Sequence, residues 1–93
     1  MDLRELEYLT ALSEEGSVSR AADRLYMSQS SLSQFLQQYE DDLGVRLFLR
    51  TSKGIRPTTS GELFIEHMQR ILLDYQRARN ELWDNESMKG GRV

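Results

Sequence analysis

Residues 17–44, SVSRAADRLYMSQSSLSQFLQQYEDDLG, decide the fold of this chain. Apolar residues recur at helical spacing in two runs, 18–25 and 32–43, and positions 26–27 separate the runs. Ser28 is a favourable N-cap residue for the second run. The stretch therefore predicts two helices joined by a tight turn, which is a helix-turn-helix. On the second helix, one buried stripe is expected from Leu32, Leu36, Tyr39 and Leu43.

The opposite face of the second helix carries neutral side chains that form hydrogen bonds. They are Gln29, Ser30, Ser31, Ser33, Gln34, Gln37 and Gln38. A helix-turn-helix directs such a face into the DNA major groove. The alternative is a solvated surface, since most polar helix faces are simply exposed to water. Phe35 beside this face is expected at the edge of the core, with a contact to a thymine methyl group as the alternative.

A further helix is predicted before this stretch and a strand pair after it. Asp2 and Glu5 have the spacing of a capping box, and Gly16 is suited to end the first helix. After residue 44 the apolar positions alternate, so a short strand is expected with Val45, Leu47 and Leu49 on its buried face. The turn SKG and an edge strand marked by Pro57 complete a wing over residues 47–57.

The last predicted helix combines core and seam positions. Thr58 or Thr59 is expected to cap it, with Glu62 closing a capping box from Thr59. Its apolar residues alternate steps of four and three, as in a coiled coil. The candidate residues for covering this seam against a second helix are Phe64, Met68, Ile71, Leu72, Tyr75, Ala78, Leu82 and Trp83. For residues 63–71 the open alternative is packing on the chain's own core.

Composition sets the remaining bounds. The 93 residues amount to one small domain, with no cysteine, one histidine and a net charge of −3. No catalytic residues, metal site or cofactor are expected, and no apolar run approaches membrane-spanning length, so we expect a soluble cytoplasmic protein without membrane contacts. The single histidine, His67, is expected on a helix surface.

The charge is unevenly distributed along the chain. Residues 1–16 carry a charge of −4, residues 17–56 carry +2 and residues 57–93 carry −1. Residues 46–56 contain no acid and hold Arg46, Arg50, Lys53 and Arg56. This segment indicates a local site for phosphate attraction, although a solvated strand pair would have the same composition.

From residue 3 to about residue 73 the chain resembles the N-terminal domain of LysR-type transcriptional regulators. The matching motifs are LRELEYL, EEGSVSRAADRL, SQSSLS, LGVRLF and RTSKGIRPTTSGE, in this order. The resemblance implies a mainly α winged helix-turn-helix with a three-helix core, a two-stranded wing and a long C-terminal linker helix. The expected divisions are a DNA-binding domain at 1–58, a linker and dimerisation helix at 59–84 and a flexible tail at 85–93.

The resemblance also implies a role for individual side chains. For base reading by the recognition helix, residues 28–43, it implies Gln29, Ser30, Ser31, Ser33, Gln34 and Gln37. For the DNA backbone or minor groove it implies Ser17, Ser28, Gln38, Arg50, Thr51, Lys53 and Arg56. Position 30 is commonly proline in the family, and positions 34, 37 and 38 are frequently basic. Because glutamine pairs most naturally with adenine, we expect operator half-sites richer in A·T.

The resemblance implies sequence-specific binding of double-stranded DNA by a homodimer joined through antiparallel linker helices. A small-molecule effector would bind a separate domain that is absent from this chain, which is either a fragment or a natural short form. An enzyme is not expected. The alternative function is a winged-helix module for protein interaction or dimerisation that does not read DNA, and the acidic total charge favours it.

Overall fold

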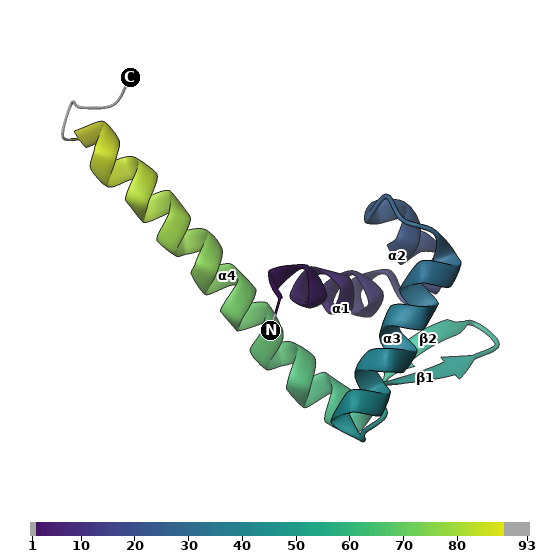
Figure 1. Ribbon diagram of the computed structural model, residues 1–93. Coiled ribbons are helices and arrows are strands. Elements are labelled where there is room, and N and C mark those ends of the chain that lie inside the picture. Colours follow the sequence, from purple (N-terminus) through teal and green to yellow (C-terminus); the bar gives the residue numbers. More distant parts are fainter. Residues whose placement is uncertain (1, 89–93) are drawn as a thin grey trace.

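The computed structural model describes residues 2–88, which form four helices and a two-stranded sheet (Figure 1). In chain order the elements are α1 (Leu3–Glu15), α2 (Val18–Arg24), α3 (Gln29–Leu43), β1 (Phe48–Thr51), β2 (Gly54–Pro57) and α4 (Thr59–Met88). The predicted fold class, a winged helix-turn-helix followed by a long helix, is confirmed. Among the described residues, α4 continues beyond position 84, the predicted end of the linker helix. The remainder of the predicted tail, 89–93, lies outside the described residues.

The predicted ends of the first helix are confirmed. Asp2 accepts a hydrogen bond from the backbone N–H of Arg4 at 3.0 Å, and the Glu5 carboxylate accepts one from the backbone N–H of Asp2 at 3.1 Å. This reciprocal pair is a capping box. Gly16 ends α1 in the left-handed conformation, with φ 66°. Its position matters because the Gly16 carbonyl accepts a hydrogen bond from Ile55 on β2 at 3.0 Å.

The helix-turn-helix forms as predicted, with one exception at its end. Ser17 and Ser28 cap α2 and α3 through their side-chain oxygens. Tyr26 makes the turn between them with φ 56°, a left-handed conformation that is uncommon for a bulky residue. Leu43 was expected in the buried stripe of α3, but its side chain is 43% exposed. Leu43 is the last residue of α3, and this end of the helix extends beyond the core, so the Leu43 side chain faces solvent.

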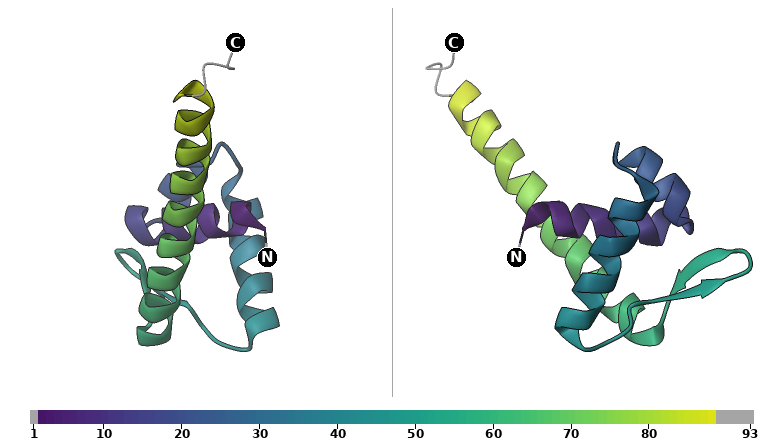
Figure 2. Two further views of the ribbon diagram at one scale, coloured as in Figure 1. Left: turned by 90° about the vertical axis from the view of Figure 1, so that its left-hand side faces the viewer. Right: turned by 45° about the vertical axis from the view of Figure 1, so that its right-hand side comes forward.

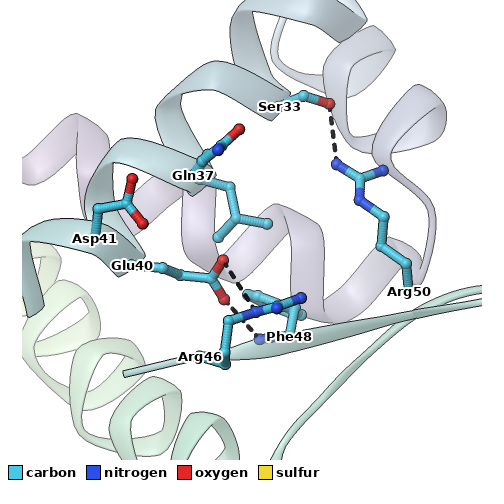
Figure 3. Close-up of a pocket in the computed structure, with 8 residues that line it drawn as sticks. Ser33, Gln37, Glu40, Asp41, Arg46, Phe48 and Arg50 are labelled. Atoms are coloured by element: carbon cyan, nitrogen blue, oxygen red, sulfur yellow. Dashed lines mark hydrogen bonds and ion pairs between the residues drawn. The ribbon is translucent and has the colours of Figure 1, made fainter. Parts of the chain in front are cut away.

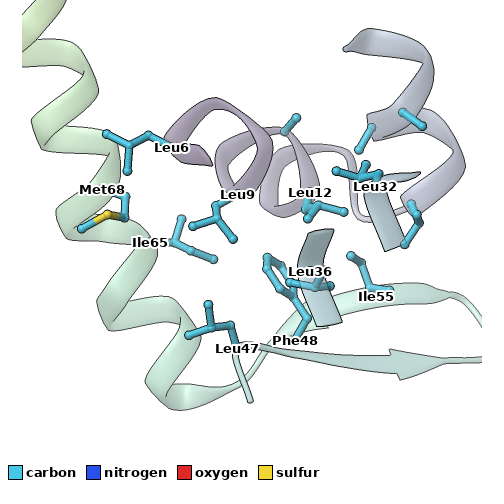
Figure 4. Packing of buried hydrophobic residues seen from close by; sticks show 14 residues of the cluster. Leu6, Leu9, Leu12, Leu32, Leu36, Leu47, Phe48, Ile55, Ile65 and Met68 are labelled. Atoms are coloured by element: carbon cyan, nitrogen blue, oxygen red, sulfur yellow. The ribbon is translucent and has the colours of Figure 1, made fainter. Parts of the chain in front are cut away.

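Buried side chains from all six elements form one core (Figure 4). The most buried large side chains are Leu6, Leu9, Leu12, Leu32, Leu47 and Phe48. Val45 and Leu49 were expected on the buried face of the first strand, but both are exposed. Leu47, expected on the same face, is buried, but the strand begins only at Phe48, so the alternation counted from Val45 places Leu49 inward in place of Phe48.

The two strands are antiparallel and form the predicted wing. Arg50 pairs with Ile55, and Leu49 pairs with Arg56. The tight end of the wing requires glycine: Gly54 has φ 131°, and a Cβ there would lie 2.2 Å from the Gly16 carbonyl oxygen. The wing therefore packs against the end of α1 at Gly54 and Ile55, and the turn at residues 52–53 projects into solvent (Figure 2).

Helix α4 begins with Thr58 as its cap. The Thr58 hydroxyl accepts a hydrogen bond from the backbone N–H of Gly61 at 2.9 Å and donates one to the Arg46 carbonyl at 2.8 Å. The predicted capping box from Thr59 to Glu62 is wrong, because Thr59 is already the first helical residue. The start of α4 packs across α1, and its later turns extend away from the domain as a single rod (Figures 1 and 2).

Candidate nucleic-acid interface

The polar face predicted on the second helix lies on the outside of α3. At about 100° per residue, Gln34 points opposite to the buried pair Leu32 and Leu36. The exposed members of the predicted base-reading group are Gln29, Ser30, Ser31, Gln34 and Gln37. Ser33 is half-buried because it lies on the flank of α3 that faces the wing. Helix α3 thus presents neutral hydrogen-bonding groups outward over its first ten residues.

A groove separates this helix from strand β1 (Figure 3). Its polar walls are Ser33, Gln37, Glu40 and Asp41 from α3, with Arg46 and Arg50 opposite. Arg50 crosses the groove and donates a hydrogen bond from Nη2 to the Ser33 hydroxyl oxygen at 3.2 Å. The structure therefore brings a residue predicted to contact the DNA backbone directly against one predicted to read bases.

A second hollow gathers residues from three elements. It is lined by Ser17, Val18 and Ser19 at the start of α2, Gln29 at the start of α3, and Arg50, Thr51, Gly54 and Ile55 of the wing. Four of these, Ser17, Gln29, Arg50 and Thr51, were predicted to contact DNA. Residues more than thirty positions apart in the sequence thus share one small concave surface that carries hydroxyl groups, an amide and a guanidinium.

Three of the predicted backbone contacts already hold the local structure. Ser17 accepts a hydrogen bond from the backbone N–H of Arg20 at 3.3 Å. Ser28 accepts one from the backbone N–H of Ser31 at 3.1 Å. Thr51 donates to the Gly54 carbonyl and accepts from the backbone N–H of Lys53, both at 3.2 Å. These hydroxyls orient the ends of two helices and the wing tip.

The cations of the wing lie on different faces. Arg50 pairs with Ile55, which is buried, so both lie on the face of the wing that is turned towards α3. Arg56 pairs with the exposed Leu49 on the other face, and Lys53 lies at the tip between the strands. Of the three wing cations predicted to contact the DNA backbone, Arg50 therefore lies beside α3, whereas Lys53 and Arg56 lie farther from it.

Two acidic residues of α3 shape this surface and were not predicted to. Glu40 has a side chain only 10% exposed, and its carboxylate accepts hydrogen bonds from the backbone N–H groups of Leu47 at 2.6 Å and Phe48 at 3.0 Å. Asp41 lines the groove together with Gln37, on the outward face. The sequence shows the acidic run EDD, but the roles of Glu40 and Asp41 could have been predicted only by assigning each residue of the run to a face of the helix.

Phe35 lies at the edge of the core, as expected. Its ring meets Tyr8 of α1 edge to face at 5.0 Å between centroids and lies 5.4 Å from Tyr39. It also borders a shallow hollow with Gln34 and Gln38 on the outer surface of α3. The side chain of Gln38 donates a hydrogen bond to Asp42 at 3.0 Å, which holds its amide along the helix.

The predicted dimer contacts divide at Ile71. Met68 is buried in this chain's own core, and Phe64 packs against that core beside Tyr39 of α3, so for these two residues the structure has the alternative arrangement, packing on the chain's own core. Ile65, which was not predicted, is buried with them. The remaining members of the predicted set lie on the outside: Leu72 is half-buried, and Ile71, Tyr75, Ala78, Leu82 and Trp83 are exposed.

Between residues 2 and 88 no helix, including α4, combines the length and the apolar character that are needed to cross a bilayer. His67 is exposed on α4, as expected.

Comparison with known proteins identifies a family. Residues 3–62 match the family model described as bacterial regulatory helix-turn-helix protein, lysR family. The chain is 43% identical over 72 residues to the HTH-type transcriptional regulator ClcR of Pseudomonas putida, which covers 77% of this chain and 24% of ClcR. It thus spans about a quarter of the length of the curated relatives that it matches.

Solved structures share this fold, and among them CbnR is described as a LysR family transcriptional regulator. A complex of the BenM DNA-binding domain with benA site 1 DNA superimposes with a TM-score of 0.86 at 32% identity, covering 94% of this chain and 98% of that one. A complex of the CbnR DNA-binding domain with DNA gives a TM-score of 0.78 at 36% identity and covers 99% and 100% of the two chains.

Proposed function

Because the chain belongs to the LysR family of bacterial helix-turn-helix regulators, we propose that it binds double-stranded DNA sequence-specifically, as the DNA-binding portion of a transcriptional regulator. One observation carries the proposal: the neutral polar face of α3 and a wing cation form a joined surface, since Arg50 is bonded to Ser33 across the groove. This surface offers hydrogen-bonding groups for base edges next to a positive charge for phosphate. The solved DNA complexes of the BenM and CbnR DNA-binding domains, which share this fold, support the proposal.

In this proposal the first turns of α3 enter the major groove. The base-reading group is Gln29, Ser30, Ser31, Ser33, Gln34 and Gln37, and the group for the backbone or minor groove is Ser17, Ser28, Gln38, Arg50, Thr51, Lys53 and Arg56. The acidic run 40–42 lies at the other end of α3. Since these carboxylates would repel phosphates, the C-terminal end of α3 tilts out of the groove.

The glutamines at the centre of this face favour A·T pairs. A glutamine amide can donate to N7 and accept from N6 of adenine in a bidentate pair, whereas the arginines common in the family pair with guanine. Gln34 and Gln37 are exposed and uncharged at these places. The proposed operator therefore has A·T-rich half-sites, and a selection from a random duplex pool that returned G·C at the contacted positions would contradict this assignment.

We also propose that the chain forms a homodimer through α4. From Ile71 to Leu82 the helix exposes apolar side chains on the part that extends away from the domain, and water-exposed seams of this kind gain free energy by pairing. Two recognition helices would then read two half-sites of one operator. A DNA-binding regulator of this kind acts in the bacterial cytoplasm, and the relatives' description as transcriptional regulators gives no reason to propose catalysis.

The test is fluorescence anisotropy of the chain on a labelled duplex with A·T-rich inverted repeats and on a scrambled duplex, at several salt concentrations. Tighter binding to the repeat, with a steep fall in affinity as salt rises, is the expected result. Equal weak binding to both duplexes would contradict sequence reading. Absence of binding at low salt, with dimerisation intact, would favour the alternative, a protein-interaction module.

A further inference from the structure

Arg50 is held in a fixed position beside the recognition helix. Strand β1 is anchored directly before it, since Phe48 is buried and its backbone N–H is bonded to the Glu40 carboxylate. Pairing with Ile55 turns Arg50 towards α3. Its guanidinium ends 3.2 Å from the Ser33 hydroxyl oxygen (Figure 3).

This contact decides which hydrogen bonds Ser33 can offer. A guanidinium has only donors, so in the bond between the two residues the Ser33 oxygen is the acceptor. A serine hydroxyl has one proton and two lone pairs, and here one lone pair is occupied. Within residues 2–88 the Ser33 hydroxyl makes no other hydrogen bond, which leaves its proton available as a donor. The adjacent positive charge strengthens this donor and weakens the remaining lone pair.

We infer that Arg50 sets base preference by fixing Ser33 as a hydrogen-bond donor, in addition to contacting a phosphate. The inference rests on the proposed DNA-binding function. A donor at this place favours base edges that present acceptors, namely purine N7, guanine O6 and thymine O4. It disfavours the amino groups of cytosine and adenine, which need an acceptor. Arg50 is thus a positioning residue for sequence reading.

The two roles of Arg50 can coexist. One of its five N–H groups is directed at Ser33, which leaves four others for a phosphate. Arg50 lines two hollows, one shared with Gln37 and the other with Ser17 and Gln29. A phosphate bound there would be held by charge whatever the sequence. Affinity for all duplexes and preference at one base pair therefore report separately on the two roles.

The experiment is a selection of duplexes from a random pool, followed by anisotropy on the selected site and its single-base variants. It uses the full chain and the variants Ser33→Ala, Arg50→Met and the double variant. Comparison of Ser33→Ala with the native chain identifies the base pair that Ser33 reads. At that pair we expect each single variant to lose roughly tenfold discrimination, and the double variant to lose no more than either single variant.

Arg56→Met is the matched control. Arg56 is a cation of the same wing on the face that is turned away from Ser33, so its loss should weaken all duplexes and reduce the salt dependence without altering preference at the identified pair. The inference is overturned if Arg50→Met behaves in the same way as Arg56→Met. It is also overturned if Ser33→Ala changes preference at no base pair. If the native chain selects no sequence at all, the proposed function itself fails, an outcome that the unaltered chain alone reveals.

Discussion

Glu40 joins the recognition helix to the wing by a single side chain. Its carboxylate accepts two backbone hydrogen bonds, from Leu47 and Phe48, and lies 3.8 Å from the guanidinium of Arg46 (Figure 3). The Leu47 N–H lies in the link between α3 and β1, and the Phe48 N–H lies at the first residue of β1. The strand position, and with it the position of Arg50, therefore depends on Glu40.

Replacing Glu40 with alanine should destabilise the fold. The substitution leaves two partly buried N–H groups unpaired, so we expect the free energy of unfolding to fall by about 2–3 kcal/mol in urea denaturation. Asp42→Ala is the control, because Asp42 is exposed and bonds only to the Gln38 side chain among the described residues. Its effect should stay within about 0.5 kcal/mol. Equal losses in the two variants would contradict the structural role of Glu40.

Gln34 and Lys53 should separate base reading from backbone attraction. Gln34 lies at the centre of the outward face of α3, so Gln34→Ala should cost roughly 1–3 kcal/mol of discrimination at one base pair. Lys53 lies at the wing tip, so Lys53→Ala should weaken all duplexes alike and lower the salt slope by about one. Anisotropy on the operator and its single-base variants measures both. A uniform loss for Gln34→Ala would refute its assignment as a base reader.

At the scale of elements, the joint between α4 and β1 depends on a glycine in the first turn of a helix. A Cβ on Gly61 would lie 1.9 Å from the Leu47 carbonyl oxygen, far inside contact distance. Close approach at this point lets Thr58 bond to the Arg46 carbonyl and lets Ile65 and Met68 reach the core. The orientation of the whole of α4 relative to the domain follows from it.

Gly61→Ala should be destabilising although alanine is the better helix former. The expected loss is roughly 1–3 kcal/mol, since α4 must move away from Leu47 to relieve the overlap. Alanine at the neighbouring exposed position, Ser60→Ala, gives the matched comparison and should be neutral or slightly stabilising. Thermal unfolding followed by circular dichroism reports both. If Gly61→Ala were at least as stable as Ser60→Ala, the start of α4 could move away from Leu47 without loss of stability, and the prediction would be wrong.

Features that are formed by residues close together in the sequence could be predicted from it. The predicted caps of α1 and α3, from Asp2 and Ser28, are formed by side chains within three residues of the groups that they satisfy, and both are present. A four-residue strand contains too few positions to fix which face is buried, so Phe48 was placed on the wrong side. The role of Glu40 was likewise missed because its partners lie in another element.

The helical seam of α4 was ambiguous for a different reason. Packing on the chain's own core and packing on a second chain require the same spacing of apolar residues. Met68 and Leu82 therefore look alike in the sequence, while the structure buries the first at 5% exposure and leaves the second 61% exposed. The candidate site divides in the same way: its members on α3 follow from periodicity, whereas the contact of Arg50 with Ser33 depends on tertiary structure.

At the scale of the whole molecule, the proposed DNA-binding surface and the proposed dimer seam lie at opposite ends of the structure. The wing and α3 lie at one end, and the later turns of α4 extend from the other side of α1 (Figure 2). The wing segment itself carries no acid: residues 46–56 hold four cations in a chain whose net charge is −3. In the proposed complex, this separation would keep phosphate attraction local and leave α4 free to pair without interfering with DNA.

Charge placed in the α4 seam should break the proposed dimer and spare the domain. Leu82 is exposed and far from the core, so Leu82→Glu should leave the unfolding midpoint of the domain within a few degrees of the native value at low protein concentration. In a dimer, both copies would bring a carboxylate into an apolar contact, so the dissociation constant should rise at least about tenfold. Sedimentation equilibrium over a concentration series measures this change. Asn80→Glu adds the same charge to the opposite side of α4 and should dimerise as the native chain does. Operator binding by Leu82→Glu should weaken in parallel with dimerisation, because a monomer holds one half-site with a single recognition helix. If Leu82→Glu dimerised as strongly as the native chain, the seam would not be the dimer interface.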